Sequence, residues 1–190
     1  MLSRRDTLRL LAGTAGLVVL PLPRVAWASR SVAASLPELL GLSDRVALGA
    51  SQGGECQWED VGGQRRIVTY SHVCVDELVA GDGSDGELVV RTLGGRVGNI
   101  GQVVHGEARL LRGEPCLLFL SETEPGLHRV TARAQGHFPI RADAHGVGRL
   151  EASPNRPELV DEGRSAARDL VGRSVPDAKA LIRSMRHDGR

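Results

Sequence analysis

Residues 66–95, RIVTYSHVCVDELVAGDGSDGELVVRTLGG, decide the fold that we predict for this chain. Two runs rich in β-branched residues flank a cluster of glycine, aspartate and serine, which is typical of a long antiparallel hairpin. In the first run Val73 and Val75 fall on one face of a strand, and Cys74 and Asp76 fall on the other. The stretch therefore predicts two paired strands, one face of which is buried in a β-barrel or sandwich.

Before the hairpin, the pattern predicts a short helix and a long, bent strand. Residues 35–38 read as a capping box with proline in the first turn, and we expect this helix to end at Gly41. The strand begins within residues 43–49 and is interrupted by the pair Gly53-Gly54, where a bulge or bend is expected. It resumes and turns at residues 60–64, which lead into the hairpin.

After the hairpin, the chain reads as short strands separated by turns. A glycine-rich connection at residues 94–101 comes first, and the continuously apolar run 116–120 predicts a central strand buried on both faces. A further strand is expected over 128–134 and onward through 138–140, and a last one near 146–151.

The C-terminal part changes character and reads as helical. Residues 155–158 and 174–177 both look like helix starts with proline in the first turn, although Gly163 weakens the first of these helices. The second start is followed by an apolar stripe at helical spacing, formed by Val175, Ala178, Leu181, Ile182 and Met185. The stripe predicts a helix that docks on the β domain, with a partner-binding helix as the alternative.

These elements predict a mainly β protein with helical ends. We expect a small OB-like or Greek-key barrel of five to six strands, with a short N-terminal helix and a C-terminal helix. The predicted organisation is a β-barrel domain over residues 29–153 and a helical C-terminal extension over residues 154–190.

Residues 1–28 have the organisation of an export signal. A basic segment with the pair Arg4-Arg5 precedes an apolar run, residues 10–22, that is too short to span a membrane. The segment resembles the twin-arginine (Tat) signals of bacterial exported proteins, and it departs from their consensus at Thr7, where the family prefers phenylalanine. A Sec signal and a retained amphipathic anchor are the alternatives.

A cleavage site of the A-x-A type, formed by Ala26 and Ala28, ends this segment. Cleavage by signal peptidase after Tat export predicts a periplasmic or extracellular protein that begins at Ser29 and has no stable membrane span. The Tat translocon and the signal peptidase are thus the expected partners during export.

The body of the chain, over about residues 36–140, carries further motifs. They are the order L-x-x-L, Ser-Asp and x-Val within residues 36–49, the strand of residues 73–82, the glycine-rich connection and the apolar run ending at residue 120. In these the chain is similar to a group of bacterial secreted proteins of unknown function, and more distantly to OB-like netrin/TIMP-type modules. The resemblance implies an OB-like fold and no particular activity.

The charge balance argues against nucleic acid as a partner. The sequence has 24 basic and 23 acidic residues, and residues 1–28 hold four arginines and one aspartate. Without them 20 basic and 22 acidic residues remain, so the net charge becomes about −2. Lys179 is the single lysine, and binding through phosphate neutralisation is not supported.

Three cysteines, Cys56, Cys74 and Cys116, leave at least one thiol unpaired. Because Tat cargo folds in the reducing cytoplasm, we expect all three to be buried as small hydrophobic side chains. A Cys56–Cys74 bridge between neighbouring strands is the second possibility, and a reactive or metal-binding role is the third.

Residues 49–53 spell G-x-S-x-G, the nucleophile elbow of α/β-hydrolases, with Ser51 at its centre. The elbow needs a helix after the serine, and no helical pattern follows here. A small serine hydrolase that uses Ser51, with Asp143 and His145 as the downstream pair, is the enzymatic alternative.

Metal sites find little support in the spacing of potential ligands. Residues 81–85 contain G-x-G-x-D, the centre of a calcium-binding repeat, yet one copy cannot stack and a hairpin turn explains its composition. No histidine pair has the spacing of a helical zinc site. A periplasmic metal-binding protein using His137, His145 and a cysteine stays open as a further alternative, although we predict no cofactor.

Functional contacts concentrate on loops that a rigid scaffold holds in place. We therefore expect the glycine-rich segment at residues 94–106 to form the ligand surface. Its polar side chains are Arg96, Asn99, Gln102 and His105. The sequence thus predicts an exported binding or accessory module, not an enzyme, with an unknown protein or small molecule as ligand.

Overall fold

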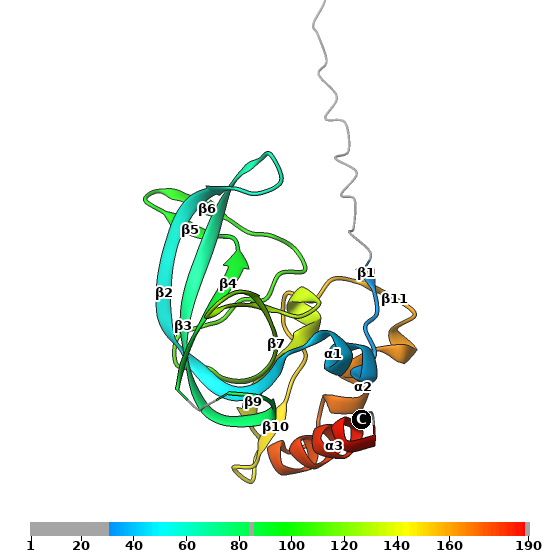
Figure 1. The fold of residues 1–190 in the computed structure, drawn as a ribbon. Helices are drawn as coiled ribbons and strands as arrows, with labels where there is room; N and C mark the ends of the chain where they lie inside the picture. The colour runs from blue at the N-terminus through cyan, green and yellow to red at the C-terminus, as the bar shows by residue number, and fades with distance from the viewer. Residues whose placement is uncertain (1–30, 84–85, 189–190) are drawn as a thin grey trace, which may run out of the picture.

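The structure is a computed structural model that describes residues 31–83 and 86–188 (Figure 1). The predicted export signal, with Arg4, Arg5, Ala26 and Ala28, lies outside the described residues. Within the described ranges, no helix is both long and apolar enough to cross a membrane.

The prediction of a mainly β fold with a C-terminal helix is confirmed. The strands are β1 (Ser31–Val32), β2 (Arg45–Asp60), β3 (Arg65–Gly81), β4 (Glu87–Leu93), β5 (Gly95–Val97), β6 (Ile100–Gln102), β7 (Pro115–Glu124), β8 (Leu127–Val130), β9 (His137–Ala142), β10 (Gly148–Leu150) and β11 (Leu159–Val160). The helices are α1 (Leu36–Leu42), α2 (Ala166–Leu170) and α3 (Val175–Asp188), with the short 3-10 helices η1 (Arg133–Gly136) and η2 (Glu162–Arg164).

Five strands pair in a ring, which we call the strand ring. Strand β2 pairs with β3 and with β7, β3 pairs with β4, β4 pairs with β8, and β8 pairs with β7. The β4–β8 pair is parallel, whereas the other four pairs are antiparallel. Strands β9 and β10 extend the same sheet beyond β7.

Two apolar clusters lie on opposite faces of this sheet. The first, the ring cluster, draws residues from all five ring strands, among them Val90 of β4 and Val130 of β8. The second, the helix cluster, joins the sheet to α1, α2 and α3, which lie together at one side (Figure 1). On β7, Leu118 belongs to the ring cluster and Phe119 to the helix cluster, which confirms a central strand buried on both faces.

The predicted hairpin is present as β3 and β4. Val73 and Val75 are buried while Cys74 and Asp76 are exposed, as the alternation predicts. The bulge or bend predicted at Gly53-Gly54 is present as a register shift between Ser51 and Gly53 in the pairing of β2 with β3. Strand β2 itself continues through this point.

Two helix predictions are confirmed. The capping box of α1 forms, because Ser35 Oγ accepts from the amide of Glu38 and the Ser35 amide donates to the Glu38 carboxylate. The helix, however, continues past Gly41 to Leu42. Helix α3 docks on the chain's own helix cluster: Ala178 and Ile182 are fully buried, and the remaining stripe residues, Val175, Leu181 and Met185, are partly buried there.

Two other predictions are corrected. The strand expected over residues 128–140 is divided by η1, because Ala132 and Arg133 adopt left-handed backbone (φ 50° and 57°), which no strand can continue. The first C-terminal helix is reduced to α2, since β11 and η2 occupy the segment that contains Gly163.

The cysteine predictions are partly wrong. All three thiols are free, and the Cys56–Cys74 bridge is contradicted by strand register, since Cys56 lies opposite Thr69 and Cys74 lies opposite Ala50. Cys116 is buried, and burial raises its pKa to about 12. Cys74, by contrast, is exposed, because its place in β3 alternates with the buried valines.

Candidate functional site

A polar pocket of about 390 Å³ lies where β4, β7 and β8 meet the segment that leads into η1. We call it the arginine pocket, because three guanidinium groups line it. Its lining residues are Leu42, Arg91, Leu93, Glu107, Ser121, Arg129, Val130, Thr131, Ala132 and Arg133. This size is sufficient for a small organic ligand.

Strand pairing aligns polar side chains on the outside of the strand ring. Arg91 on β4 pairs with Tyr70 on β3 and with Arg129 on β8, and Arg129 pairs in turn with Ser121 on β7. Their neighbours Val90 and Val130 belong to the ring cluster, so the alternation of strand side chains directs Arg91 and Arg129 outward. The result is one polar row that crosses four strands.

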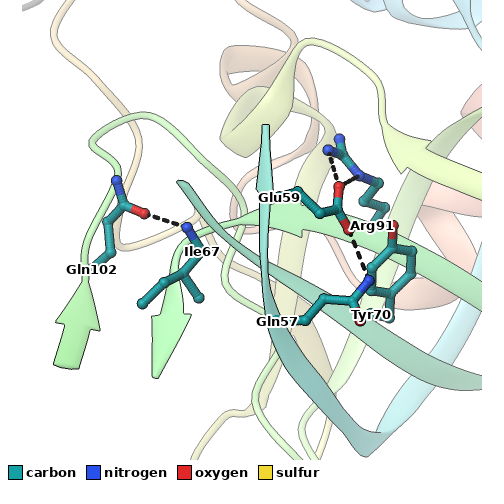
Figure 2. Close-up of polar contacts among 6 residues, drawn as sticks. All are labelled: Gln57, Glu59, Ile67, Tyr70, Arg91 and Gln102. Atoms are coloured by element: carbon teal, nitrogen blue, oxygen red, sulfur yellow. Dashed lines mark hydrogen bonds and ion pairs between the residues drawn. The ribbon is translucent and has the colours of Figure 1, made fainter. Parts of the chain in front are cut away.

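At one end of this row, Glu59 accepts hydrogen bonds from three side chains (Figure 2). Arg91 Nη2 donates to its Oε2 at 2.8 Å, while Tyr70 Oη at 2.6 Å and Gln57 Nε2 at 3.0 Å donate to its Oε1. Partial burial raises the pKa of Glu59, but these hydrogen bonds together outweigh burial and hold the pKa at about 2. Arg91 is therefore fixed in the wall of the pocket by a carboxylate that is ionised at neutral pH.

The other two guanidinium groups have looser partners. Arg129 Nε donates to Ser121 Oγ at 3.1 Å, and no carboxylate within residues 31–83 and 86–188 forms an ion pair with Arg129. Arg133 Nε lies 3.8 Å from Glu107 Oε2, and the Arg133 side chain is 63% exposed. Donors of Arg129 and Arg133 are thus available to a ligand.

Glu107 is the single carboxylate among the pocket's lining residues. Its side chain is 10% exposed, and burial raises its pKa, an effect that the nearby Arg133 only partly opposes. Glu59 neutralises Arg91, so Arg129 and Arg133 against Glu107 leave the pocket with an excess of positive charge, which favours an anion.

The backbone at the rim of the pocket is strained. Ala132 and Arg133 are two successive non-glycine residues in the left-handed region, a conformation that costs on the order of 1 kcal/mol or more for each. Hydrogen bonds hold it in place: the Ala134 amide donates to the Gly106 carbonyl at 3.0 Å, and Ser43 Oγ bonds Thr131 Oγ1 at 2.9 Å. Strain of this kind concentrates at functional sites.

The four residues expected to bind ligand are not among those that line the arginine pocket, and they lie on the β5–β6 hairpin and the loop after it. Gln102 Oε1 accepts from the amide of Ile67 at 2.6 Å, so this side chain fastens the hairpin to β3 (Figure 2). Arg96 Nε donates to the Gly98 carbonyl at 3.0 Å within the hairpin. Asn99 and His105 are exposed.

Ser51 has the surroundings of a structural serine. It is 2% exposed, its Oγ accepts from the Gly53 amide at 3.1 Å, and β2 continues past it where an elbow would start a helix. Asp143 accepts from the amides of His145 and Val147 and from Arg149 Nε in the β9–β10 turn, so its carboxylate is already occupied.

The described residues do not bring potential metal ligands together. Over residues 31–83 and 86–188, no three histidine, cysteine, aspartate or glutamate side chains form a group that could hold a metal ion. His137 is buried at 1% exposure beside Ser153, whereas His145 is exposed in the β9–β10 turn. The turn with the G-x-G-x-D pattern includes residues 84–85, which lie outside the described part of the chain.

Sequence reasoning missed the arginine pocket. The sequence does contain one indication, which is the alternation of side chains along β4 and β8. Val90 and Val130 are buried, so their neighbours Arg91 and Arg129 face solvent. That signal shows that each arginine faces outward, but the parallel pairing that makes them neighbours appears only in the fold.

Comparison with protein-family models, with curated proteins and with solved structures found no match to this chain. The class of protein is therefore defined by its own fold and site: a mainly β domain with a pocket lined by arginines.

One prediction concerns the polar row directly. Replacing Tyr70 with phenylalanine removes the hydrogen bond that its hydroxyl donates to Glu59. We expect the pKa of Glu59 to rise from about 2, and the free energy of unfolding to fall by about 1 kcal/mol. Carboxyl-carbon NMR titration and urea unfolding measure the two effects, and an unchanged Glu59 pKa in Tyr70→Phe would show that this bond does not form in solution.

Proposed function

We propose that the protein is an exported binding module, not an enzyme, and that it holds a small organic anion in the arginine pocket. The observation that carries the proposal is the position of Arg129. Arg129 lines the pocket with two other arginines, and within the described ranges it has no carboxylate to neutralise it. Guanidinium groups bind carboxylates and phosphates through paired, charge-assisted hydrogen bonds, so an anion is the complementary ligand.

The structure of the pocket supports binding in two further respects. Glu59 holds Arg91 in place, so little side-chain freedom is lost when a ligand meets this guanidinium. The strained segment at Ala132 and Arg133 forms one wall. On the β5–β6 hairpin, the other candidate surface, Arg96 and Gln102 already bond to the chain's own backbone.

Titration calorimetry with butyl phosphate tests this function. We expect the wild type to bind it and Arg129→Gln to bind about tenfold more weakly, which corresponds to ~1.4 kcal/mol. The matched control is Arg141→Gln, because Arg141 is an exposed arginine of β9 that pairs with Glu114 outside the pocket. Equal affinity in wild type and Arg129→Gln, or no binding by the wild type, would refute the proposed site.

Removing the charge of Glu107 is expected to change the affinity for butyl phosphate in the direction opposite to Arg129→Gln. Glu107→Gln removes the negative charge from the pocket, so we expect it to strengthen butyl phosphate binding by about threefold to tenfold at pH 7. Because burial raises the pKa of Glu107, the affinity gain of Glu107→Gln over the wild type is expected to shrink as the pH is lowered toward that pKa, where the wild-type carboxyl also becomes neutral. Weaker binding by Glu107→Gln would mean that the carboxylate contacts the ligand favourably.

Export is part of the proposed function and is supported by the order of the motifs in residues 1–28. Replacement of Arg4 and Arg5 by lysine is expected to leave the precursor in the cytoplasm, as measured by cell fractionation. Undiminished export of the lysine variant would instead indicate the Sec route.

A further inference from the structure

A second depression adjoins the arginine pocket. It has a volume of about 520 Å³ and lies between β1, α1 and the start of η1. We call it the apolar groove. Its lining residues are Ser31, Val32, Ala33, Ala34, Glu38, Leu42, Ala132, Arg133 and Gln135. Leu42, Ala132 and Arg133 line both depressions, so the two form one continuous surface.

Two polar side chains of the apolar groove, Glu38 and Gln135, are engaged within the protein. Glu38 accepts from the hydroxyl of Ser35 at 2.7 Å and from its amide at 2.8 Å in the capping box of α1. Gln135 accepts from the Ala34 amide at 2.8 Å and donates to the Val32 carbonyl at 3.0 Å. Neither side chain therefore needs a ligand to satisfy it.

Beside the exposed charged side chains of Glu38 and Arg133, the groove offers apolar surface to solvent. Val32 is 80% exposed and Leu42 is 65% exposed, and both are among the large hydrophobic residues that face water in the described chain. Gln135 and strand β11 fix β1 in place, so Val32 is held in this position by backbone hydrogen bonds. An apolar surface beside a cationic pocket is complementary to a molecule with an anionic head and an apolar tail.

We propose that the ligand is an anionic amphiphile with a single alkyl chain, whose headgroup lies between Arg91 and Arg129 and whose chain runs past Leu42 toward Val32. This inference rests on the function proposed above, since it deepens the description of the same site. The chain passes Arg133 at the junction, where the aliphatic part of that exposed side chain lies beside the alkyl carbons. The chemistry is shared by alkyl phosphates and fatty acids, since both combine a head that a guanidinium can bind with an alkyl tail.

The test compares two alkyl phosphates that differ in chain length alone. Calorimetry with butyl phosphate and with decyl phosphate, below its micelle concentration and at 0.15 M salt, should give at least thirtyfold tighter binding of the decyl compound. Decanoate should likewise bind more tightly than butanoate, because its longer alkyl chain reaches the apolar groove. Decanol, which has no charge, should bind far more weakly than decyl phosphate.

Val32→Ser is expected to weaken decyl phosphate binding about fivefold and to leave butyl phosphate binding unchanged. Its matched control is Val160→Ser, because Val160 is the exposed partner of Val32 across the β1–β11 pair and does not line the groove. Circular dichroism verifies that both variants keep the wild-type fold.

The outcomes separate the two proposals. If butyl phosphate binds and depends on Arg129 but decyl phosphate binds no more tightly, the amphiphile inference is overturned while the proposed function stands. If Val32→Ser and Val160→Ser weaken decyl phosphate binding equally, the alkyl chain does not lie in the groove and the amphiphile inference is also overturned. If neither phosphate binds, or if Arg129→Gln has no effect, the proposed function itself fails.

Discussion

Acidification from pH 6.5 to pH 4 is expected to lower the free energy of unfolding by about 3 kcal/mol through His137 alone. His137 lies at the start of β9 with 1% exposure, and burial lowers its pKa to about 4. Its Nδ1 lies 3.1 Å from Ser153 Oγ, while its Nε2 has no hydrogen-bond partner among the described residues. The folded protein therefore keeps this imidazole neutral where the unfolded chain would protonate it.

The sign follows from proton linkage. Below pH 6.5 the unfolded chain binds a proton that the folded protein does not bind until about pH 4, so stability is lost as the pH falls through this window. Burial also lowers the pKa of His128, which adds in the same direction. The low pKa of Glu59 also makes the free energy of unfolding fall with pH, but at lower pH, from about 4.5 downward.

His137→Asn isolates the contribution of His137, because asparagine can keep a hydrogen bond to Ser153 without titrating. Urea unfolding at a series of pH values should show a flatter profile for this variant between pH 6.5 and pH 4. The matched control, His145→Asn, changes an exposed histidine and should keep the wild-type profile. Parallel profiles for wild type and His137→Asn would contradict the buried, neutral state of His137.

Gly49→Ala is expected to destabilise the protein by about 3 kcal/mol or more. Gly49 lies in β2 between Val75 of β3 and Cys116 of β7, where the strands of the ring approach closely. A Cβ at this position would lie 2.2 Å from the carbonyl oxygen of Cys74 and 3.1 Å from its carbonyl carbon. Both are backbone atoms, so the strand itself must shift to make room.

Gly41→Ala is the matched control for this steric argument. Gly41 lies inside α1, and a Cβ there would meet nothing within 4 Å. The same substitution should therefore stabilise the protein by up to ~1 kcal/mol, because alanine favours the helix more than glycine does. Equal effects of the two substitutions in urea unfolding would show that β2 and β3 do not approach as closely as the structure describes.

Much of the fold could be predicted from local sequence patterns. The alternation at Val73 and Val75, the capping box at Ser35 and the apolar stripe of α3 can each be recognised from residue types at fixed spacing within a short segment. The division of the strand by η1 could not be predicted, because neither Ala132 nor Arg133 is a residue type that favours left-handed backbone. Tertiary contacts, such as the bond from the Ala134 amide to Gly106, impose that conformation.

The candidate site could be predicted from the sequence less well than the fold. The arginine pocket depends on a parallel pairing between β4 and β8, strands that β5, β6 and β7 separate in the chain. The sequence predicts a ligand surface on the glycine-rich segment because loops often bind ligands, but Gln102 and Arg96 hold that hairpin in place. A nonlocal pairing of two arginines has no local signature, so only the fold reveals their convergence.

NMR of the arginine Nε–H groups during titration with butyl phosphate tests the central claim most directly. We predict that the resonances of Arg91, Arg129 and Arg133 shift together with a single affinity, whereas that of Arg96 on the β5–β6 hairpin stays in place. Shifts at Arg96 and at the backbone amide of Asn99, with none at the three pocket arginines, would contradict the arginine pocket and locate the ligand on the glycine-rich hairpin instead.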